Sequence, residues 1–177
     1  MLRVLLLIGV LAVAAAAATI SPETLYVNCQ LPMNTTATCS REAPCATIAL
    51  ALRLVPNLQQ TTILVAPTVV ECPDRELRIE NKLLMLASSS SPAVVHVSLR
   101  RRERFLLAVN SSLTVRGFAI ADGFAATNGG AIAAINSELA LLDCSFVSNV
   151  ALSLGGAVSA EFTRALPPSL SPSVRLQ

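Results

Sequence analysis

Two stretches of the chain show the same order of hydrophobic and polar positions at a fixed interval. In the first stretch Leu113 and Val115 alternate with polar neighbours, and after a break at Arg116-Gly117 the alternation resumes at Phe118 and Ile120. Alternation with a period of two is typical of a strand with one buried face. The break leaves no room for a hairpin, so it indicates a bend between consecutive strands of one coil. In the second stretch the matching apolar positions are Leu139, Leu141, Cys144 and Phe146, which defines a 26-residue register.

A pair of glycines recurs with the same spacing. Gly129-Gly130-Ala131-Ile132 returns as Gly155-Gly156-Ala157-Val158. Glycine adopts positive φ and lets backbones approach closely, as a sharp corner requires. Strands that recur at a fixed interval stack in parallel, each coil covering the apolar stripe of the next. We therefore expect an all-β fold, a right-handed parallel β-helix, with Gly129, Gly130, Gly155 and Gly156 at its turns.

Short apolar or alternating runs continue this pattern upstream. They predict strands over residues 61–65, 76–80, 83–86, 94–97 and 105–109. One helix is expected, with Thr47 as its N-cap, Ile48, Leu52 and Val55 on one face, and Pro56 at its end. Such a helix would cap the open N-terminal end of the first coil, which otherwise exposes its apolar interior and unpaired strand edges.

The two ends of the chain differ in character from this middle part. Residues 1–18 combine Arg3, an apolar run and small residues ending at Ala18, a pattern typical of a cleaved signal peptide. An uncleaved anchor helix is the alternative, but the run is shorter than the roughly 20 residues that cross a bilayer. The β-helix is expected over 24–162, and the Pro- and Ser-rich residues 163–177 as an unstructured tail. No closing cap follows the last coil, so we expect a fragment, a truncated gene product, or self-association through the open solenoid end.

An exported chain meets oxidising conditions, which changes the interpretation of its cysteines. Cys29, Cys39, Cys45 and Cys72 are expected to form two disulfides, for which three pairings exist. Cys45–Cys72 together with Cys29–Cys39 is the pairing that we favour. Cys144 is left over and points inward in the 26-residue register, as a buried thiol. Asn34 and Asn110 head candidate N-glycosylation sequons.

Composition argues against several classes of function. Charged residues make up 14% of the chain and the net charge is +2, so we expect no nucleic-acid partner. The one charged cluster, Arg100 to Arg104, could bind acidic glycans or be a processing site for a protease, but we interpret it first as a solvated loop. His96, the single histidine, alternates outward and is expected on the surface.

Patterns typical of catalysis and metal binding are weak in this chain. Polysaccharide lyases and hydrolases use clustered carboxylates. The 26-residue register sets Asp122 opposite Ser148 and Asp143 opposite Gly117, so these aspartates form no ladder. No C-x-x-C motif occurs. We therefore expect no catalytic residue, no metal and no cofactor.

At the repeats the chain resembles a known family. The two Gly-Gly-Ala motifs and Phe146-Val147-Ser148-Asn149 are similar to the GGA(I/L/V) and FxxN repeats of the polymorphic outer membrane protein family, within the pectin-lyase-like β-helix superfamily. The counterpart of FxxN, Ile120 to Gly123, departs from the motif. The likeness extends from Thr24 to Phe162 and includes the N-terminal Thr24-Leu-Tyr-Val and the run that begins at Pro44. We expect Asn149 to bond neighbouring backbone at a corner.

The resemblance implies surface-exposed or secreted adhesion proteins in bacteria and extracellular proteins in microbial eukaryotes. The translocator β-barrel that follows the repeats in the bacterial members has no counterpart among the strand patterns of this chain. The expected function is therefore that of a secreted or cell-surface, non-catalytic β-helix protein in adhesion or surface structure, with host or cell-surface molecules as partners. The alternative is the N-terminal part of a pectin-lyase-like enzyme acting on polysaccharides.

Overall fold

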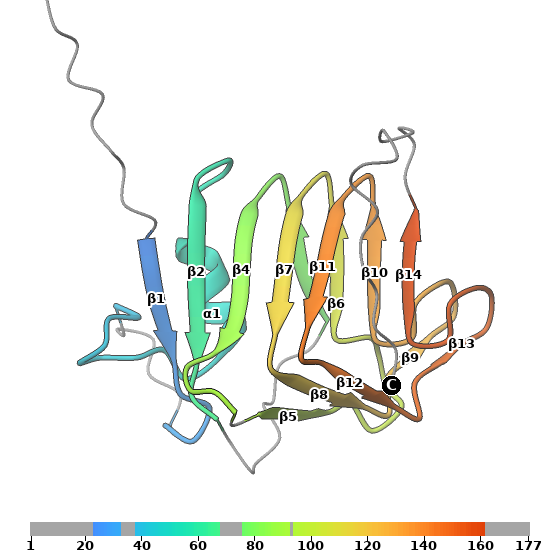
Figure 1. The fold of residues 1–177 in the computed structure, drawn as a ribbon, viewed down its shortest axis with the longest axis horizontal. Helices are drawn as coiled ribbons and strands as arrows, with labels where there is room; N and C mark the ends of the chain where they lie inside the picture. Colours follow the sequence, from blue (N-terminus) through green and yellow to red (C-terminus); the bar gives the residue numbers. More distant parts are fainter. Residues whose placement is uncertain (1–22, 33–37, 68–75, 93, 162–177) are drawn as a thin grey trace, which may run out of the picture.

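The chain winds into a parallel β-solenoid. The structure is a computed structural model that describes residues 23–32, 38–67, 76–92 and 94–161. In Figure 1 the strands of the front sheet run downward, those of the back sheet run upward, and successive coils advance from left to right, so the solenoid is right-handed. The predicted signal peptide, Asn34, Cys72 and the tail 163–177 lie outside the described residues, and the domain boundaries that rest on them stay predictions.

Four parallel sheets form the sides of the solenoid. The front sheet contains β1 (Glu23–Val27), β2 (Gln60–Val65), β4 (Leu83–Ser88), β7 (Ser112–Arg116) and β11 (Glu138–Leu142). The back sheet contains β3 (Leu77–Glu80), β6 (Leu106–Val109), β10 (Ile132–Ile135) and β14 (Val158–Glu161). The base sheet contains β5 (Val95–Ser98), β8 (Phe118–Ala121) and β12 (Ser145–Val147). A short sheet pairs β9 (Phe124–Ala125) with β13 (Val150–Ala151).

The 26-residue register that the sequence predicts is confirmed. Leu113 pairs with Leu139 in the front sheet, and Ile120 pairs with Phe146 in the base sheet. Earlier coils keep the same sheets with different lengths of chain. Leu84 pairs with Leu113, which is a longer interval than in the repeat, and Ile63 pairs with Leu86, which is a shorter one. Inward-facing apolar residues therefore stay paired from coil to coil along the front sheet, and the loops between the strands differ in length.

One corner of the solenoid is turned by asparagine in successive coils. Asn81, Asn110 and Asn136 lie between the back sheet and the front sheet, with φ of 55°, 49° and 50°. Asparagine adopts this left-handed conformation more readily than most residues. Each backbone N–H at the corner still reaches the next coil, as in the bond of 3.1 Å from Asn110 to the carbonyl of Ile135. The ladder of hydrogen bonds between coils therefore continues around this corner.

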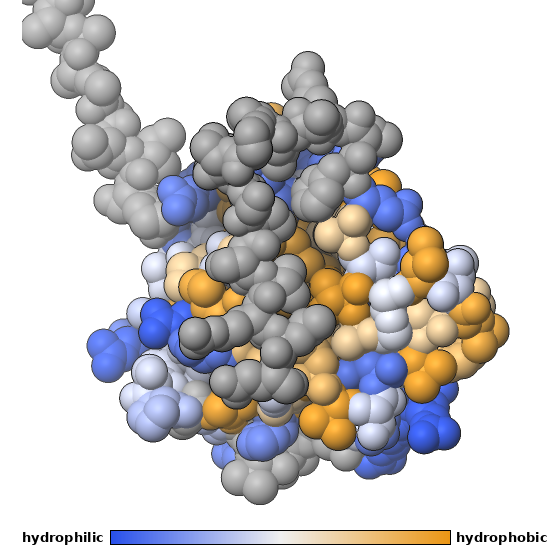
Figure 2. Space-filling model, turned by 45° about the vertical axis from the view of Figure 1, so that its right-hand side comes forward, coloured by the Kyte–Doolittle hydropathy of each residue, from blue (hydrophilic) through white to orange (hydrophobic). Residues whose placement is uncertain are grey.

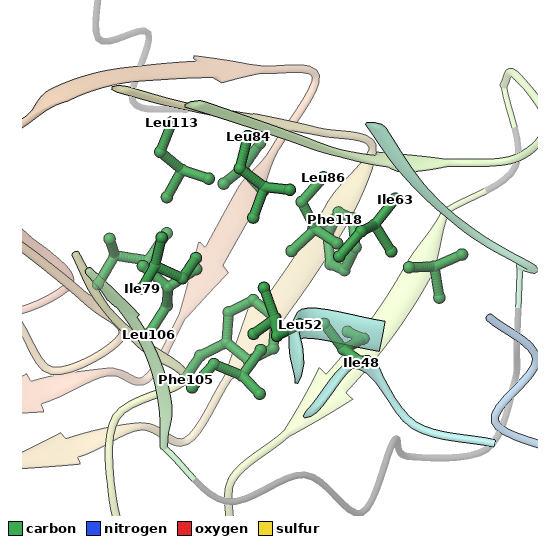
Figure 3. Packing of buried hydrophobic residues seen from close by; sticks show 14 of the residues in the cluster. Ile48, Leu52, Ile63, Ile79, Leu84, Leu86, Phe105, Leu106, Leu113 and Phe118 are labelled. Atoms are coloured by element: carbon green, nitrogen blue, oxygen red, sulfur yellow. The ribbon is translucent and has the colours of Figure 1, made fainter. Parts of the chain in front are cut away.

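A single apolar column fills the solenoid, and a helix covers its N-terminal end. Helix α1 (Ile48–Leu54) has Thr47 as N-cap, whose Oγ1 accepts a bond of 3.1 Å from the Leu50 N–H. Ile48 is fully buried and points with Leu52 into the interior near Ile63 and Phe105 (Figure 3). The helix contacts β1, β2 and β3. The predicted short capping helix is therefore confirmed.

The C-terminal end is different, because among the residues that the structure describes strands β11, β12, β13 and β14 are each the last of their sheet. Apolar side chains are exposed on this coil, with Leu152 and Leu154 both 68% exposed. Figure 2 shows apolar surface gathered on the end of the molecule that it turns forward. Unpaired strand edges beside apolar side chains are a template for pairing with further chain. Self-association through this end of the solenoid stays a prediction.

The packing between coils predicts a strong effect at Gly130 and a weak one at Gly156. A Cβ at Gly130 would lie 2.3 Å from the carbonyl oxygen of Gly156 and 2.5 Å from that of Val150. At Gly156 the nearest atom, the oxygen of Asn149, would be 3.6 Å away. We expect Gly130→Ala to lower the free energy of unfolding by roughly 1–3 kcal/mol, because backbone must move, and Gly156→Ala to leave it within about 1 kcal/mol. Denaturant titration measures both, and equal losses would contradict this account of the corner.

Candidate functional site

The two glycines of each repeated motif serve different purposes. Gly129 and Gly155 have φ of 67° and 62°, a conformation that L side chains rarely adopt. Gly130 has no such φ, and it is required instead because the next coil passes directly over it. Its N–H donates a bond of 2.9 Å to the carbonyl of Gly156 in that coil. The motif is thus a structural corner and carries no reactive group.

Asn149 joins two coils through its side-chain amide. Its Oδ1 accepts a bond of 2.8 Å from the N–H of Gly123, and its Nδ2 donates one of 2.9 Å to the carbonyl of Ile120. A Cβ at Gly123 would lie 2.8 Å from that Oδ1. The same Cβ would lie 2.2 Å from the carbonyl oxygen of Gly130, so the backbone of Gly130 and the amide of Asn149 both require that residue 123 has no side chain. Asn149 therefore has a structural role.

The cysteine pairing that we favoured from the sequence is wrong. Cys39 is bonded to Cys45, with Cα atoms 4.6 Å apart. The reason is the backbone of Tyr26 in β1, whose N–H donates to the Cys39 carbonyl at 2.7 Å and whose carbonyl accepts from the Cys45 N–H at 2.9 Å. The backbones of both cysteines are therefore hydrogen-bonded to Tyr26, which brings the two residues next to each other. Cys29 is also disulfide-bonded, and Cys72 lies outside the described residues.

Cys144 is a free, half-buried thiol beside the core. Its Sγ lies 3.4 Å from the carbonyl oxygen of Val115 and 3.3 Å from that of Leu142, so its one S–H has two acceptors within reach. Burial raises the pKa of the Cys144 thiol, against a smaller lowering by backbone hydrogen bonds at Phe118. A thiol of raised pKa is a poor nucleophile at neutral pH because the thiolate is the reactive form.

A groove opens where the front sheet passes to the base sheet. It has a volume of about 520 Å³ and is bounded by the serine-rich loop at 88–92 and the apolar side chains of Leu64 and Met85. Arg116 and Asp143 face it as an ion pair, with Nε 3.4 Å from Oδ2 and both side chains largely exposed. Among the described residues that line the groove, Asp143 is the single carboxylate. The pair of carboxylates used in glycoside hydrolysis is therefore not assembled there.

The arginine cluster divides into two parts. Arg104 is largely buried, and its Nε lies 2.8 Å from Glu76 Oε2 in an ion pair. Arg100, Arg101 and Arg102 are exposed, as is His96 on β5. The cluster is therefore only partly the solvated loop that the sequence predicts, because Arg104 is an internal link between coils.

Of the two sequons, Asn110 lies within the described residues. It is exposed at the asparagine corner, whereas its neighbour Ser111 is buried. The Oγ of Ser111 donates to the Val109 carbonyl at 2.8 Å and is thus part of the corner. Glycosylation at Asn110 stays a prediction.

The described parts of the chain contain neither a metal-ligand cluster nor a membrane-spanning helix. Within residues 23–32, 38–67, 76–92 and 94–161, no group of three or more His, Cys, Asp or Glu is placed to hold a metal ion. In the same residues no helix has the length and apolar character to span a membrane. Comparison of the chain with models of known protein families, with curated proteins and with solved structures found no match. The β-solenoid architecture accordingly rests on the strand pairing described above.

The two hydrogen bonds of Asn149 predict a measurable loss of stability. We expect Asn149→Ala to lower the free energy of unfolding by about 1–3 kcal/mol, since two partly buried partners lose a bond. Asn57→Ala is the control, because the bond that Asn57 accepts from Lys82 Nζ is exposed. That change should stay within about 0.5 kcal/mol. Urea titration of both variants measures the difference, and equal effects would contradict a link between coils.

The raised pKa of Cys144 predicts slow alkylation of the native protein. Because its thiolate fraction becomes substantial only above the ordinary pH range of a free cysteine, iodoacetamide at pH 8 should modify it more slowly in the folded chain than in urea. The native rate should rise as the pH is raised further. Mass spectrometry of the peptide that contains Cys144 follows the reaction. Equal rates with and without urea would show that the thiol is not protected.

Proposed function

We propose that the chain is a secreted or cell-surface β-helix protein with polymorphic outer membrane protein-type repeats, which acts without catalysis in adhesion or surface structure. The observation that carries the proposal is the disulfide bonding at the N-terminal end, between Cys39 and Cys45 and at Cys29. Disulfides form and persist mainly in oxidising compartments. The signal-type pattern of residues 1–18 supports the same location.

The outer surface of the front sheet suits contact with an extended partner. One row of outward positions crosses all five strands in register. Its members have short or flexible side chains: Thr24, Thr62, Met85, Thr114 and Ala140. This row forms a low strip along the outer face of the sheet, bordered by a second outward row with larger side chains, Tyr26, Leu64, Arg116 and Leu142. Such a face can lie against a neighbouring molecule or surface, which supports adhesion or surface structure.

The groove beside the loop at 88–92 favours the non-catalytic function over the polysaccharide-active alternative. Its charged groups, Arg116 and Asp143, already neutralise each other. An acid and a base that act on a glycosidic bond need two carboxyl groups on either side of it. A single carboxylate held by an arginine supplies neither partner of that chemistry.

Export is the first property to test. The full chain with a C-terminal tag should be recovered from the medium of a eukaryotic secretory host, with a new N-terminus after Ala18 and two disulfides by mass. A variant that lacks residues 1–18 is the control and should stay inside the cells. Recovery of the full chain inside the cells with reduced cysteines would overturn the proposal. Calcium-dependent cleavage of polygalacturonate by the purified protein would favour the alternative.

A further inference from the structure

The loop at 99–105, between β5 and β6, projects three arginines from a fixed base. The residues at its two ends are buried, Leu99 with 7% and Phe105 with 0% of its surface exposed. Between them Arg100, Arg101 and Arg102 are exposed. The backbone N–H of Arg101 donates a bond of 2.6 Å to the carbonyl of Asp122 in the next coil. The loop is therefore attached to the solenoid at both ends and in its middle.

Arg104 fixes the same loop through its side chain. Its Nε lies 2.8 Å from Glu76 Oε2. Its Nη1 donates to the Asn128 carbonyl at 2.9 Å, and its Nη2 donates to Thr127 Oγ1 at 3.1 Å. These partners come from the segments before and after the loop, so Arg104 holds three successive turns of chain together. The exposed arginines begin two residues away on a backbone that has little freedom to rearrange.

Two of the exposed arginines adopt a backbone conformation that their side chains disfavour. Arg100 and Arg101 have φ of 52° and 58°. Most other left-handed positions in the solenoid are Asn, Asp or Gly, such as Asn136, Asp122 and Gly129, although Cys39, Leu58 and Ser148 also adopt this conformation. Arginine has no such advantage, so the placement lowers stability. Strain of this kind tends to persist at sites where the side chain serves a function.

We propose that Arg100, Arg101 and Arg102 form a binding site for an acidic polysaccharide, recognised through its carboxylate or sulfate groups. This inference rests on the proposed extracellular function and names the class of its ligand. A guanidinium group presents a planar set of donors that matches carboxylate and sulfate oxygens in pairs. Among the described residues, no carboxylate forms an ion pair with Arg101 or Arg102.

A polysaccharide fits this site better than a nucleic acid does. Proteins that bind single-stranded nucleic acid stack bases on exposed aromatic rings. The rings of Phe105 and Phe118, which lie next to each other in the core below the loop, are fully buried. Phe124, whose N–H donates to the Glu103 carbonyl of the loop, is half-buried. The three exposed arginines therefore outweigh this one partly covered ring, which favours a ligand whose recognition depends on its anionic groups.

The binding test uses the purified full chain and four immobilised probes: heparin for sulfate, polygalacturonate for carboxylate, neutral dextran, and poly(dT). We expect binding to at least one acidic polysaccharide that weakens as salt is raised, and none to dextran. The variant Arg100→Gln/Arg101→Gln/Arg102→Gln should lose about tenfold or more in affinity, the sum of three modest ionic contacts. The sulfate and carboxylate probes decide which acidic group is preferred.

The matched control removes the same charge elsewhere. Arg41, Arg53 and Arg78 are exposed, and the variant Arg41→Gln/Arg53→Gln/Arg78→Gln should keep affinity within about twofold. Equal losses in both triple variants would overturn the proposal, because binding would then depend on net charge alone. Absence of binding to both acidic polysaccharides would also overturn it, as would tighter binding to poly(dT) than to either of them.

A second variant separates binding from folding. Arg100→Asn/Arg101→Gly places residues that suit the left-handed conformation, so it should raise the Tm by a few degrees, about 3 °C, while weakening binding to the acidic probe. Unchanged affinity in this more stable variant would overturn the proposal. Export of all variants is measured in parallel. If they reach the medium but the wild-type chain binds no acidic probe, the ligand assignment fails while the proposed extracellular function stands.

Discussion

The structure depends on one constraint, namely that the strands of each coil find their hydrogen-bond partners in the coils before and after it. Strand β10 shows this clearly, because Ile132 pairs with Leu106 on one side and with Val158 on the other. A shift of the pairing by one residue would turn every inward side chain outward. The apolar column in Figure 3 and the ladder of backbone bonds therefore require the same register, and neither can form without the other.

This constraint explains why corners matter more than strands in the choice of residues. Strand positions accept Leu, Ile, Val or Phe as long as the register is kept. Corners must bring the backbone of one coil onto that of the next at close distance, so they need residues with special properties. Gly130 supplies space, and Asn149 supplies an acceptor and a donor to the coil before it. Replacement of a corner residue therefore disturbs two coils at once.

The repeated part of the solenoid could be predicted from the sequence because its spacing is constant from one coil to the next. The helix at 48–54 could be predicted from its cap and its apolar face. The pairing of the strands before residue 106 could not be predicted, because unequal lengths of chain separate the paired strands. Leu84 pairs with Leu113 and Ile63 with Leu86 at different intervals.

Contacts that depend on the folded backbone, within a coil or between coils, were the part that the sequence could not reveal. The disulfide between Cys39 and Cys45 was missed because it follows from backbone bonds to Tyr26, which no local pattern indicates. The same holds for Arg104 and Glu76, whose ion pair spans two coils.

The asparagine corner limits where this protein can vary. In three successive coils two residues join the back sheet to the front sheet, as at Asn110-Ser111 between β6 and β7, and their hydrogen bonds leave no room for an insertion. The opposite side of the solenoid has longer connections, including the one that separates β4 from β5 and the loop at 99–105. Natural variation in length should therefore accumulate on that side alone. A solenoid of this kind has one edge fixed by geometry and another free to acquire new specificities.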